Sequence, residues 1–184
     1  MESTVVTSRT HPLHIAEISP RAGWGVIGVS SCPGRFGGDD PHGSGVLARD
    51  LVRVREWGAK AVLSVLDRSE FDELGVTALP EQVRRSGMGW HHLPIRRRYP
   101  PGPAFERIWS DVRAEATGVL EAGERVLIHC NEGFARAWTV AACLLVECGM
   151  APVDALERVR TVQPRAIPLV LQEWYVINYR RQGS

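Results

Sequence analysis

The pattern of apolar and polar positions predicts short strands that alternate with amphipathic helices along the 184-residue chain. Apolar runs of strand length occur at 14–18, 26–29, 61–66, 90–95 and 126–129. Apolar residues at helical spacing predict helices over 44–57, 80–85, 105–122, 137–148, 152–162 and 168–181. Because strands alternate with helices, we expect one α/β domain over 14–184, with a mainly parallel central sheet and helices on both faces. A flexible N-terminal tail at 1–13 precedes it.

One strand ends in a pattern that predicts chemistry. The apolar run 126–128 continues into His129-Cys130, and a five-residue loop leads to Arg136 at the start of an apolar helix. Amides of a loop that opens a helix, together with the helix dipole, favour an oxyanion or a thiolate. The guanidinium of Arg136 can bind two phosphate oxygens at once. The unit therefore predicts a nucleophilic Cys130 in a phosphate cradle made of Asn131, Glu132, Gly133, Phe134, Ala135 and Arg136.

Composition narrows the class of protein and its expected partners. The net charge is +1, so no strong field selects nucleic acid or a membrane, and we expect neither as a partner. Of the 22 basic residues, Lys60 is the single lysine and the rest are arginine. The four cysteines show no paired spacing, and the first ten residues lack the apolar core of a signal peptide. We therefore expect a cytoplasmic protein that is a monomer by default.

His129-Cys130-x5-Arg136 resembles the signature loop of the cysteine-dependent protein tyrosine phosphatase superfamily. Further segments resemble the kinase-associated phosphatase group of small dual-specificity enzymes: 32–34, 91–95, 127–130, 140–145, and 166–167 with Gln172. The resemblance implies two-step phosphoryl transfer through a phosphocysteine, with neither metal nor cofactor. The substrate would be a phosphorylated protein, on tyrosine, serine or threonine, or a small phosphorylated molecule.

Arg97 stands where the family has an aspartate that protonates the leaving group. No acid lies between Ile95 and Phe105, and an arginine cannot donate a proton near neutral pH. Another carboxyl group could serve, and Asp67 is favoured over Glu70, Asp72 and Glu132 because it follows a strand; a turn residue or helix cap is the simpler interpretation of Asp67. Alternatively the substrate needs no acid, as in the RNA triphosphatase branch, and the arginines at 96–98 bind additional phosphates or form a solvated loop.

Three further residues bear on the function: Ala137, and Gln172 and His129, which each also have a purely structural interpretation. Ala137 replaces the Ser or Thr of the family whose hydroxyl helps the thiolate leave phosphorus, so the intermediate should break down slowly. Gln172 matches a family glutamine that positions water, although a surface glutamine is the simpler explanation. His129 either orients Cys130 from behind or is a packed strand-end histidine.

The function that we expect is a phosphoric monoester hydrolase of the dual-specificity type, with Cys130, Arg136 and Asp67 as catalytic residues. A pseudophosphatase that binds phosphate with little turnover is the second hypothesis, favoured by Arg97 and Ala137. A phosphoanhydride hydrolase of the RNA triphosphatase kind is a further one, and a rhodanese-like transferase or arsenate reductase is more distant. A zinc site is not expected, because His91 and His92 are adjacent on a strand and point to opposite faces.

Overall fold

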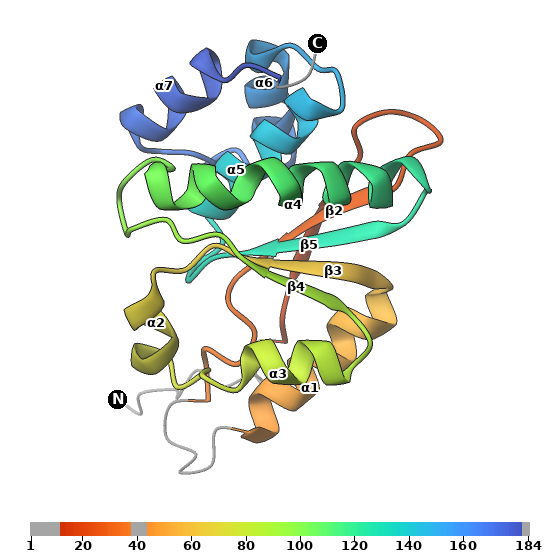
Figure 1. Cartoon of the computed structure of the whole chain (residues 1–184), viewed down its shortest axis with the longest axis vertical. Helices are drawn as coiled ribbons and strands as arrows, with labels where there is room; N and C mark the ends of the chain where they lie inside the picture. Colours follow the sequence, from red (N-terminus) through yellow and green to blue (C-terminus); the bar gives the residue numbers. More distant parts are fainter. Residues whose placement is uncertain (1–11, 38–43, 182–184) are drawn as a thin grey trace, which may run out of the picture.

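The computed structural model describes residues 12–37 and 44–181, which form five strands and seven helices (Figure 1). The strands are β1 (Ile15–Ile18), β2 (Val26–Ser30), β3 (Ala59–Ser64), β4 (Gly89–His92) and β5 (Arg125–His129). The helices are α1 (Ser44–Trp57), α2 (Arg68–Glu73), α3 (Leu79–Arg85), α4 (Pro103–Glu121), α5 (Arg136–Glu147), α6 (Pro152–Val162) and α7 (Val170–Asn178). The strand order is β1-β2-β5-β3-β4, and only β1 is antiparallel to its neighbour.

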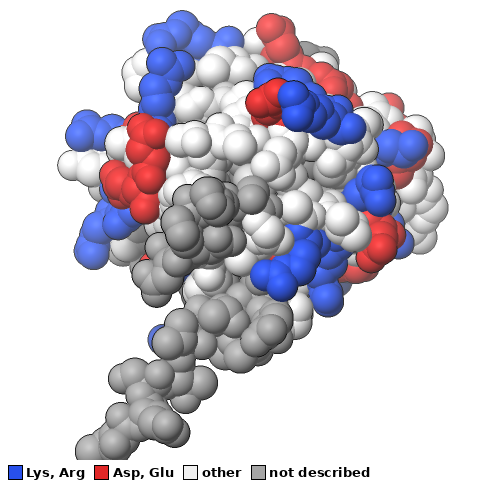
Figure 2. All heavy atoms as spheres, turned by 90° about the horizontal axis from the view of Figure 1, so that it is seen from below, with Lys and Arg blue, Asp and Glu red and all other residues white. Residues whose placement is uncertain are grey.

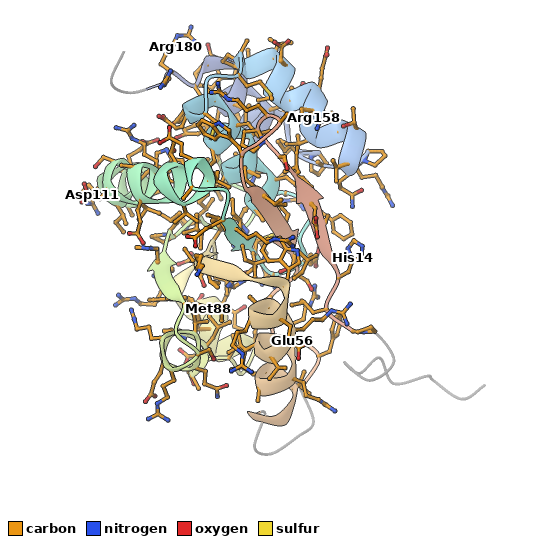
Figure 3. The ribbon with its side chains drawn as sticks, turned by 90° about the vertical axis from the view of Figure 1, so that its right-hand side faces the viewer. His14, Glu56, Met88, Asp111, Arg158 and Arg180 are labelled. Atoms are coloured by element: carbon orange, nitrogen blue, oxygen red, sulfur yellow. The ribbon has the colours of Figure 1, made fainter. Side chains whose placement is uncertain are left out.

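Helices cover both faces of this sheet, as the sequence pattern predicts. Helices α1, α2 and α3 lie on one face and α4 to α7 on the other (Figure 1), and Glu56 on α1 and Asp111 on α4 mark the two sides in Figure 3. Two apolar cores correspond to these layers, one with Leu51, Val62 and Phe71 and the other with Trp109, Ile128 and Leu144. Every side chain of α5 is buried, because α4, α6 and α7 pack around it. The predicted mainly parallel α/β fold is confirmed.

The helix α2 and the end of β4 differ from the prediction. Only six residues form α2, too few to show helical periodicity, and its charged sequence resembles a loop. Strand β4 ends at His92, three residues earlier than expected. The predicted tail lies outside the described residues up to residue 11, and Leu13 at its end is buried in the core below α1.

Charged side chains are dispersed where the surface can be inspected. On the face shown in Figure 2, the described Lys and Arg side chains alternate with Asp and Glu and form no continuous positive area. Within the described ranges, no helix combines the length and the apolar character that crossing a bilayer requires.

His129, the last residue of β5, is fully buried at the centre of the sheet. It pairs in register with Ser64 of β3, and its Nε2 lies 2.7 Å from the Ser64 hydroxyl, which also accepts a hydrogen bond from Trp90 Nε1 at 2.8 Å. Burial lowers the pKa of His129 to about 3, the nearby charge of Arg136 acts in the same direction, and a hydrogen bond to the Cys130 backbone only partly opposes them. The imidazole is therefore neutral at physiological pH and supports the structure below Cys130.

We predict that this buried imidazole makes the fold acid-sensitive. In the unfolded chain the histidine takes up a proton near pH 6.5, whereas in the fold it stays neutral to about pH 3, so stability is lost as the pH falls between these values. The free energy of unfolding should therefore fall less steeply with decreasing pH in His129→Asn than in wild type. Between pH 6.5 and 4.5 the two slopes should differ by up to about 1.4 kcal/mol per pH unit. Urea unfolding at several pH values measures this slope.

The exposed His14 provides the matched control, because His14→Asn should keep the wild-type slope. Glu70, whose pKa is lowered from 4.5 to about 2, adds to the slope only toward the lower end of this interval, and it does so equally in wild type and both variants. Equal slopes in wild type and His129→Asn would contradict the prediction.

Candidate active site

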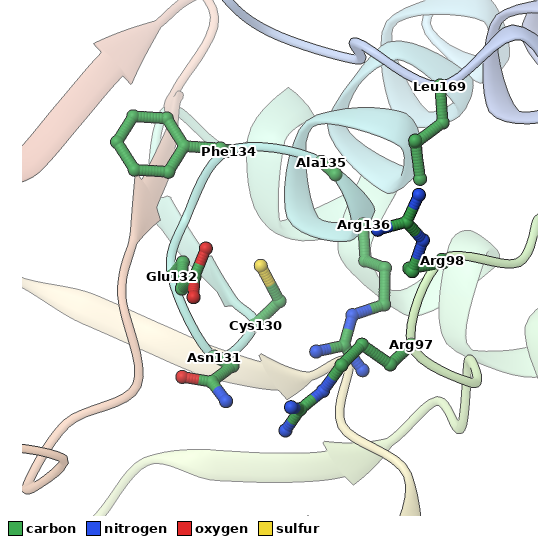
Figure 4. A pocket seen from close by; sticks show the side chains of 9 residues that line it. All are labelled: Arg97, Arg98, Cys130, Asn131, Glu132, Phe134, Ala135, Arg136 and Leu169. Atoms are coloured by element: carbon green, nitrogen blue, oxygen red, sulfur yellow. The ribbon is translucent and has the colours of Figure 1, made fainter.

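The carboxyl end of β5 opens into a cavity of about 250 Å³. Its lining comes from the loop after β5, the loop after β4 and the segment before α7: Arg97, Arg98, Cys130, Asn131, Glu132, Phe134, Ala135, Arg136 and Leu169. Figure 4 shows the sulfur of Cys130 in the middle of this cavity, with the three arginines on one side of it. Because parallel strands end at the same edge of a sheet, segments far apart in sequence meet here.

The loop between Cys130 and Arg136 is held from outside through its carbonyl groups. The Asn131 oxygen accepts hydrogen bonds from Cys32 N at 3.1 Å and from Arg35 Nη1 at 3.0 Å. The Gly133 oxygen accepts one from Trp138 Nε1 at 2.9 Å, and the Phe134 oxygen one from Ile167 N at 3.1 Å. Carbonyls bound on the outside leave the N–H groups of the same loop to face inward, so the loop has the form of an anion cradle.

Gly133 brings this cradle to the sulfur of Cys130. Its amide donates a hydrogen bond to Cys130 Sγ at 3.2 Å, the arrangement that stabilises a thiolate. The residue has φ +77°, and a Cβ built there would lie 2.9 Å from the Ser31 nitrogen, so a side chain is excluded both by backbone conformation and by space. All four cysteines are free and buried, and Cys130 is 3% exposed at the bottom of the cavity.

Arg136 is fixed by a buried ion pair with Glu70. The guanidinium Nη2 lies 2.8 Å from Glu70 Oε1, Nη1 contacts Oε2, and the two side chains are 6% and 3% exposed. The same Nη1 donates to the Ile95 carbonyl at 2.9 Å. Arg136 therefore links the ends of three strands: its own loop after β5, α2 after β3 and the loop after β4.

The ion pair determines the charge state of Glu70. Burial alone would raise the pKa of this carboxyl, but the hydrogen bonds from Arg136, from the Asp67 amide and from Arg97 outweigh burial and lower it to about 2. Glu70 is therefore ionised near neutral pH and has no proton to give. The sequence offers Glu70 only as a possible proton donor, and no local pattern indicates its contact with Arg136.

The other candidate acids occupy different surroundings. Asp67 is the N-cap of α2: its Oδ1 accepts from Arg68 N at 2.7 Å, and Glu70 completes the capping box on the Asp67 amide at 2.8 Å. Asp67 does not line the cavity, and Asp72 lines a separate one beside Trp90 and His92. Glu132 does line the cavity, on the cradle itself. The geometry thus gives Asp67 a structural contact and does not support it as a proton donor.

Gln172 and Ala137 are both fully buried beside the site. Gln172 Nε2 donates to the Tyr99 carbonyl at 2.8 Å and so ties α7 to the loop that carries Arg97. Ala137 follows Arg136 in the first turn of α5, where its methyl group cannot donate a hydrogen bond to the sulfur. In the described part of the chain, no three His, Cys, Asp or Glu side chains gather as a metal site would require.

Comparison with known proteins agrees with this geometry. The chain is 28% identical over 139 residues to the cyclin-dependent kinase inhibitor 3 of Rattus norvegicus. This match covers 73% of this chain and 63% of that protein. It is 26% identical over 131 residues to the phosphatidylglycerophosphate phosphatase PTPMT1 of Arabidopsis thaliana, covering 71% of this chain and 37% of that protein. The chain therefore spans less than two thirds of the length of these relatives.

A solved kinase associated phosphatase, with its catalytic-site cysteine replaced by serine, superposes with a TM-score of 0.78 at 25% identity, covering 92% of this chain and 94% of that one. Tk-PTP in its active form shares the fold, with a TM-score of 0.65 at 20% identity over 90% of this chain and 97% of that one. Residues 53–171, well over half of the chain, match the PTP-SAK family model, described as "Swiss Army Knife protein, DSP-PTPase phosphatase domain". The chain belongs to this family of dual-specificity-type phosphatase domains.

Proposed function

We propose that this domain is a cysteine-dependent phosphatase that hydrolyses phosphomonoesters through a phosphocysteine. The observation that carries the proposal is the Gly133 amide on Cys130 Sγ at 3.2 Å, inside a cavity that Arg136 also lines. A nucleophile, an anion cradle and a fixed guanidinium are thus within one space. Phosphorylated proteins and small phosphorylated molecules both remain candidate substrates, and we propose a cytoplasmic monomer.

The reaction has two steps that these residues can carry. The Cys130 thiolate attacks phosphorus, a sulfur–phosphorus bond forms, and the ester oxygen leaves with the electrons of the broken phosphorus–oxygen bond. Water then attacks the phosphocysteine, which releases inorganic phosphate and restores the thiolate. In both steps, Arg136 and the inward amides stabilise the charge on the equatorial phosphate oxygens.

The leaving oxygen also needs a proton unless it leaves as a stable anion. Among the described residues that line the cavity, Glu132 is the only carboxyl group, and Glu70 is ionised behind Arg136. Arg97 stands at the position where the phosphatases that this chain resembles carry their proton donor. We therefore propose that the domain acts on substrates whose leaving groups depend little on protonation.

A pseudophosphatase that binds phosphate without turnover is the second candidate. Two observations favour it: Arg97 stands where a proton donor is expected, and the first turn of α5 carries a methyl group at Ala137. Both would slow turnover and leave the cradle intact.

Phosphate release from substrates of different leaving-group pKa tests the proposal. We expect Cys130-dependent release from nitrophenyl phosphate to exceed that from a phosphoserine peptide by roughly 10²–10⁴-fold, the contribution typical of a missing general acid. Phosphotyrosine peptide and a nucleoside triphosphate complete the panel, and Cys130→Ser should abolish release from all of them. Unchanged activity in Cys130→Ser would refute the nucleophile, and absence of turnover in wild type would favour the pseudophosphatase.

Two carboxyl variants locate the source of any proton. If Glu132 assists the leaving group, Glu132→Gln should slow the phosphoserine peptide more than nitrophenyl phosphate. Because Asp67 caps α2, Asp67→Asn should affect all substrates equally, mainly through stability. A selective effect of Asp67→Asn on the poor leaving group would restore Asp67 as the acid.

A hydroxyl at position 137 should accelerate the second step. We predict that Ala137→Ser raises kcat about 10-fold, because a charge-assisted hydrogen bond to the departing thiolate is worth about 1.5–3 kcal/mol. Single-turnover kinetics should show the gain in breakdown of the phosphocysteine and no gain in its formation. A faster first step with unchanged breakdown would contradict the explanation.

Removal of the Glu70 charge should impair both fold and activity. Glu70→Gln leaves the buried Arg136 without its counter-charge, and breaking such a pair costs about 3–5 kcal/mol. We expect a lower free energy of unfolding and a lower kcat/KM. Glu73→Gln is the matched control, because Glu73 is exposed and its ion pair, with Arg97, is long at 3.4 Å. Similar losses in the two variants would show that the buried pair has no special role.

A further inference from the structure

Two arginines at the rim of the cavity have no task in the proposed reaction. Arg97 and Arg98 lie on the loop between β4 and α4 and line the same cavity as Cys130 and Arg136 (Figure 4). One transferred phosphate already has Arg136 and the loop amides as partners. Two additional guanidinium groups beside it require another explanation.

Arg97 is held close to Arg136 but retains free donors. Its Nη2 lies 3.2 Å from Glu70 Oε1, the oxygen that Arg136 Nη2 contacts at 2.8 Å, so both guanidinium groups share one atom. Its second contact, with the exposed Glu73, is long at 3.4 Å. Both contacts use one nitrogen, Nη2, of a group with five N–H donors, and the side chain is 58% exposed. The remaining donors are available to a ligand beside the Arg136 site.

Arg98 adopts a backbone conformation that needs a cause. Its φ is +68°, in the left-handed region that a non-glycine residue occupies at a cost of about 1–3 kcal/mol. Within the described residues no carboxylate contacts its guanidinium, and the side chain lies at the cavity rim (Figure 4). Arg98 is the third residue of the turn that Tyr99 N closes on the Arg96 carbonyl, a position that takes a positive φ in type II turns. The turn accounts for the backbone conformation, and its consequence is that the Arg98 side chain lies at the cavity rim.

The loop that carries both residues is anchored at its two ends. Arg136 Nη1 donates to the Ile95 carbonyl at 2.9 Å, and Gln172 Nε2 donates to the Tyr99 carbonyl at 2.8 Å. Between them, Tyr99 N closes a turn on the Arg96 carbonyl at 3.1 Å. The loop is therefore built to present its side chains, which lowers the entropic cost of binding an anion.

The charges at the cavity are unbalanced in favour of anions. Three guanidinium groups line it, and Glu132 is the only carboxylate among the described lining residues, since Glu70 lies behind Arg136. Arg96 lies on the same loop but, unlike Arg97 and Arg98, does not line the cavity. Its guanidinium lies 5.4 Å from the centre of the Tyr99 ring.

We propose that the substrate of this site carries two phosphate groups. The phosphate to be transferred lies in the cradle over Cys130, and the second is bound by Arg97 and Arg98. This inference names the substrate class of the proposed phosphatase and so rests on that function. A pyrophosphate end and two neighbouring phosphomonoesters share the required chemistry, and the loss of an aspartate at position 97 then serves the binding of the second phosphate.

Binding measured without turnover tests the site directly. By titration calorimetry with Cys130→Ser, pyrophosphate should bind at least about 10-fold more tightly than orthophosphate, the effect of one charge-assisted contact. Arg97→Gln and Arg98→Asn should abolish most of this ratio; asparagine tolerates the left-handed conformation at position 98 and should preserve the fold. Arg96→Gln, which removes the same charge outside the cavity, should keep the ratio.

Turnover then separates the two sources of paired phosphates. A higher kcat/KM for ADP than for AMP would indicate a pyrophosphate end, and a higher value for glucose 1,6-bisphosphate than for glucose 6-phosphate would indicate two phosphomonoesters. Equal binding of pyrophosphate and orthophosphate would overturn the inference, as would an equal loss of the ratio in Arg96→Gln. Absence of all turnover with the binding preference intact would refute the phosphatase proposal alone and support the two-phosphate site.

Discussion

The buried ion pair between Glu70 and Arg136 is the interaction on which the site depends. Two ions that are 3% and 6% exposed pay a large desolvation penalty, so the pair is a weak source of stability. Its effect is positional: both carboxylate oxygens are used, and Nη1 of Arg136 also donates to the Ile95 carbonyl. The guanidinium that we propose to bind the phosphate is thereby held in one orientation before a substrate arrives, which is the condition for electrostatic catalysis.

The Glu70–Arg136 pair also explains why an arginine is favourable at position 97. Glu70 Oε1 faces the loop after β4 and is already ionised because Arg136 lowers its pKa. An aspartate at position 97 would meet this negative oxygen, whereas Arg97 is attracted to it. The loop after β4 therefore carries positive charge at this position, and its hydrogen bonds at Ile95 and Tyr99 keep that charge beside Arg136.

Much of the fold and the reactive loop could be predicted from local patterns. The strand that ends at His129, the glycine at 133 and the apolar helix from Arg136 are encoded within about twenty consecutive residues, so their arrangement follows from neighbours in sequence. Helix α2 could not be found by periodicity, although Asp67-x-x-Glu70 is a capping-box pattern that indicates a helix start. The partner of Glu70 lies 66 residues away, and no local pattern specifies such a contact.

Asp67 and Glu70 illustrate why the acid could not be assigned from sequence. Asp67 lies nearer than Glu70 to the end of β3, so position at the strand end favours Asp67. The capping box turns the Asp67 carboxylate to the amide of Arg68, and the ladder of β3 beside β5 brings Glu70 to Arg136. Which carboxylate meets Arg136 is decided by one turn of helix. The loop that holds Cys130 is therefore a local property of the chain, whereas tertiary contacts place Glu70, Arg97 and Arg98 near it.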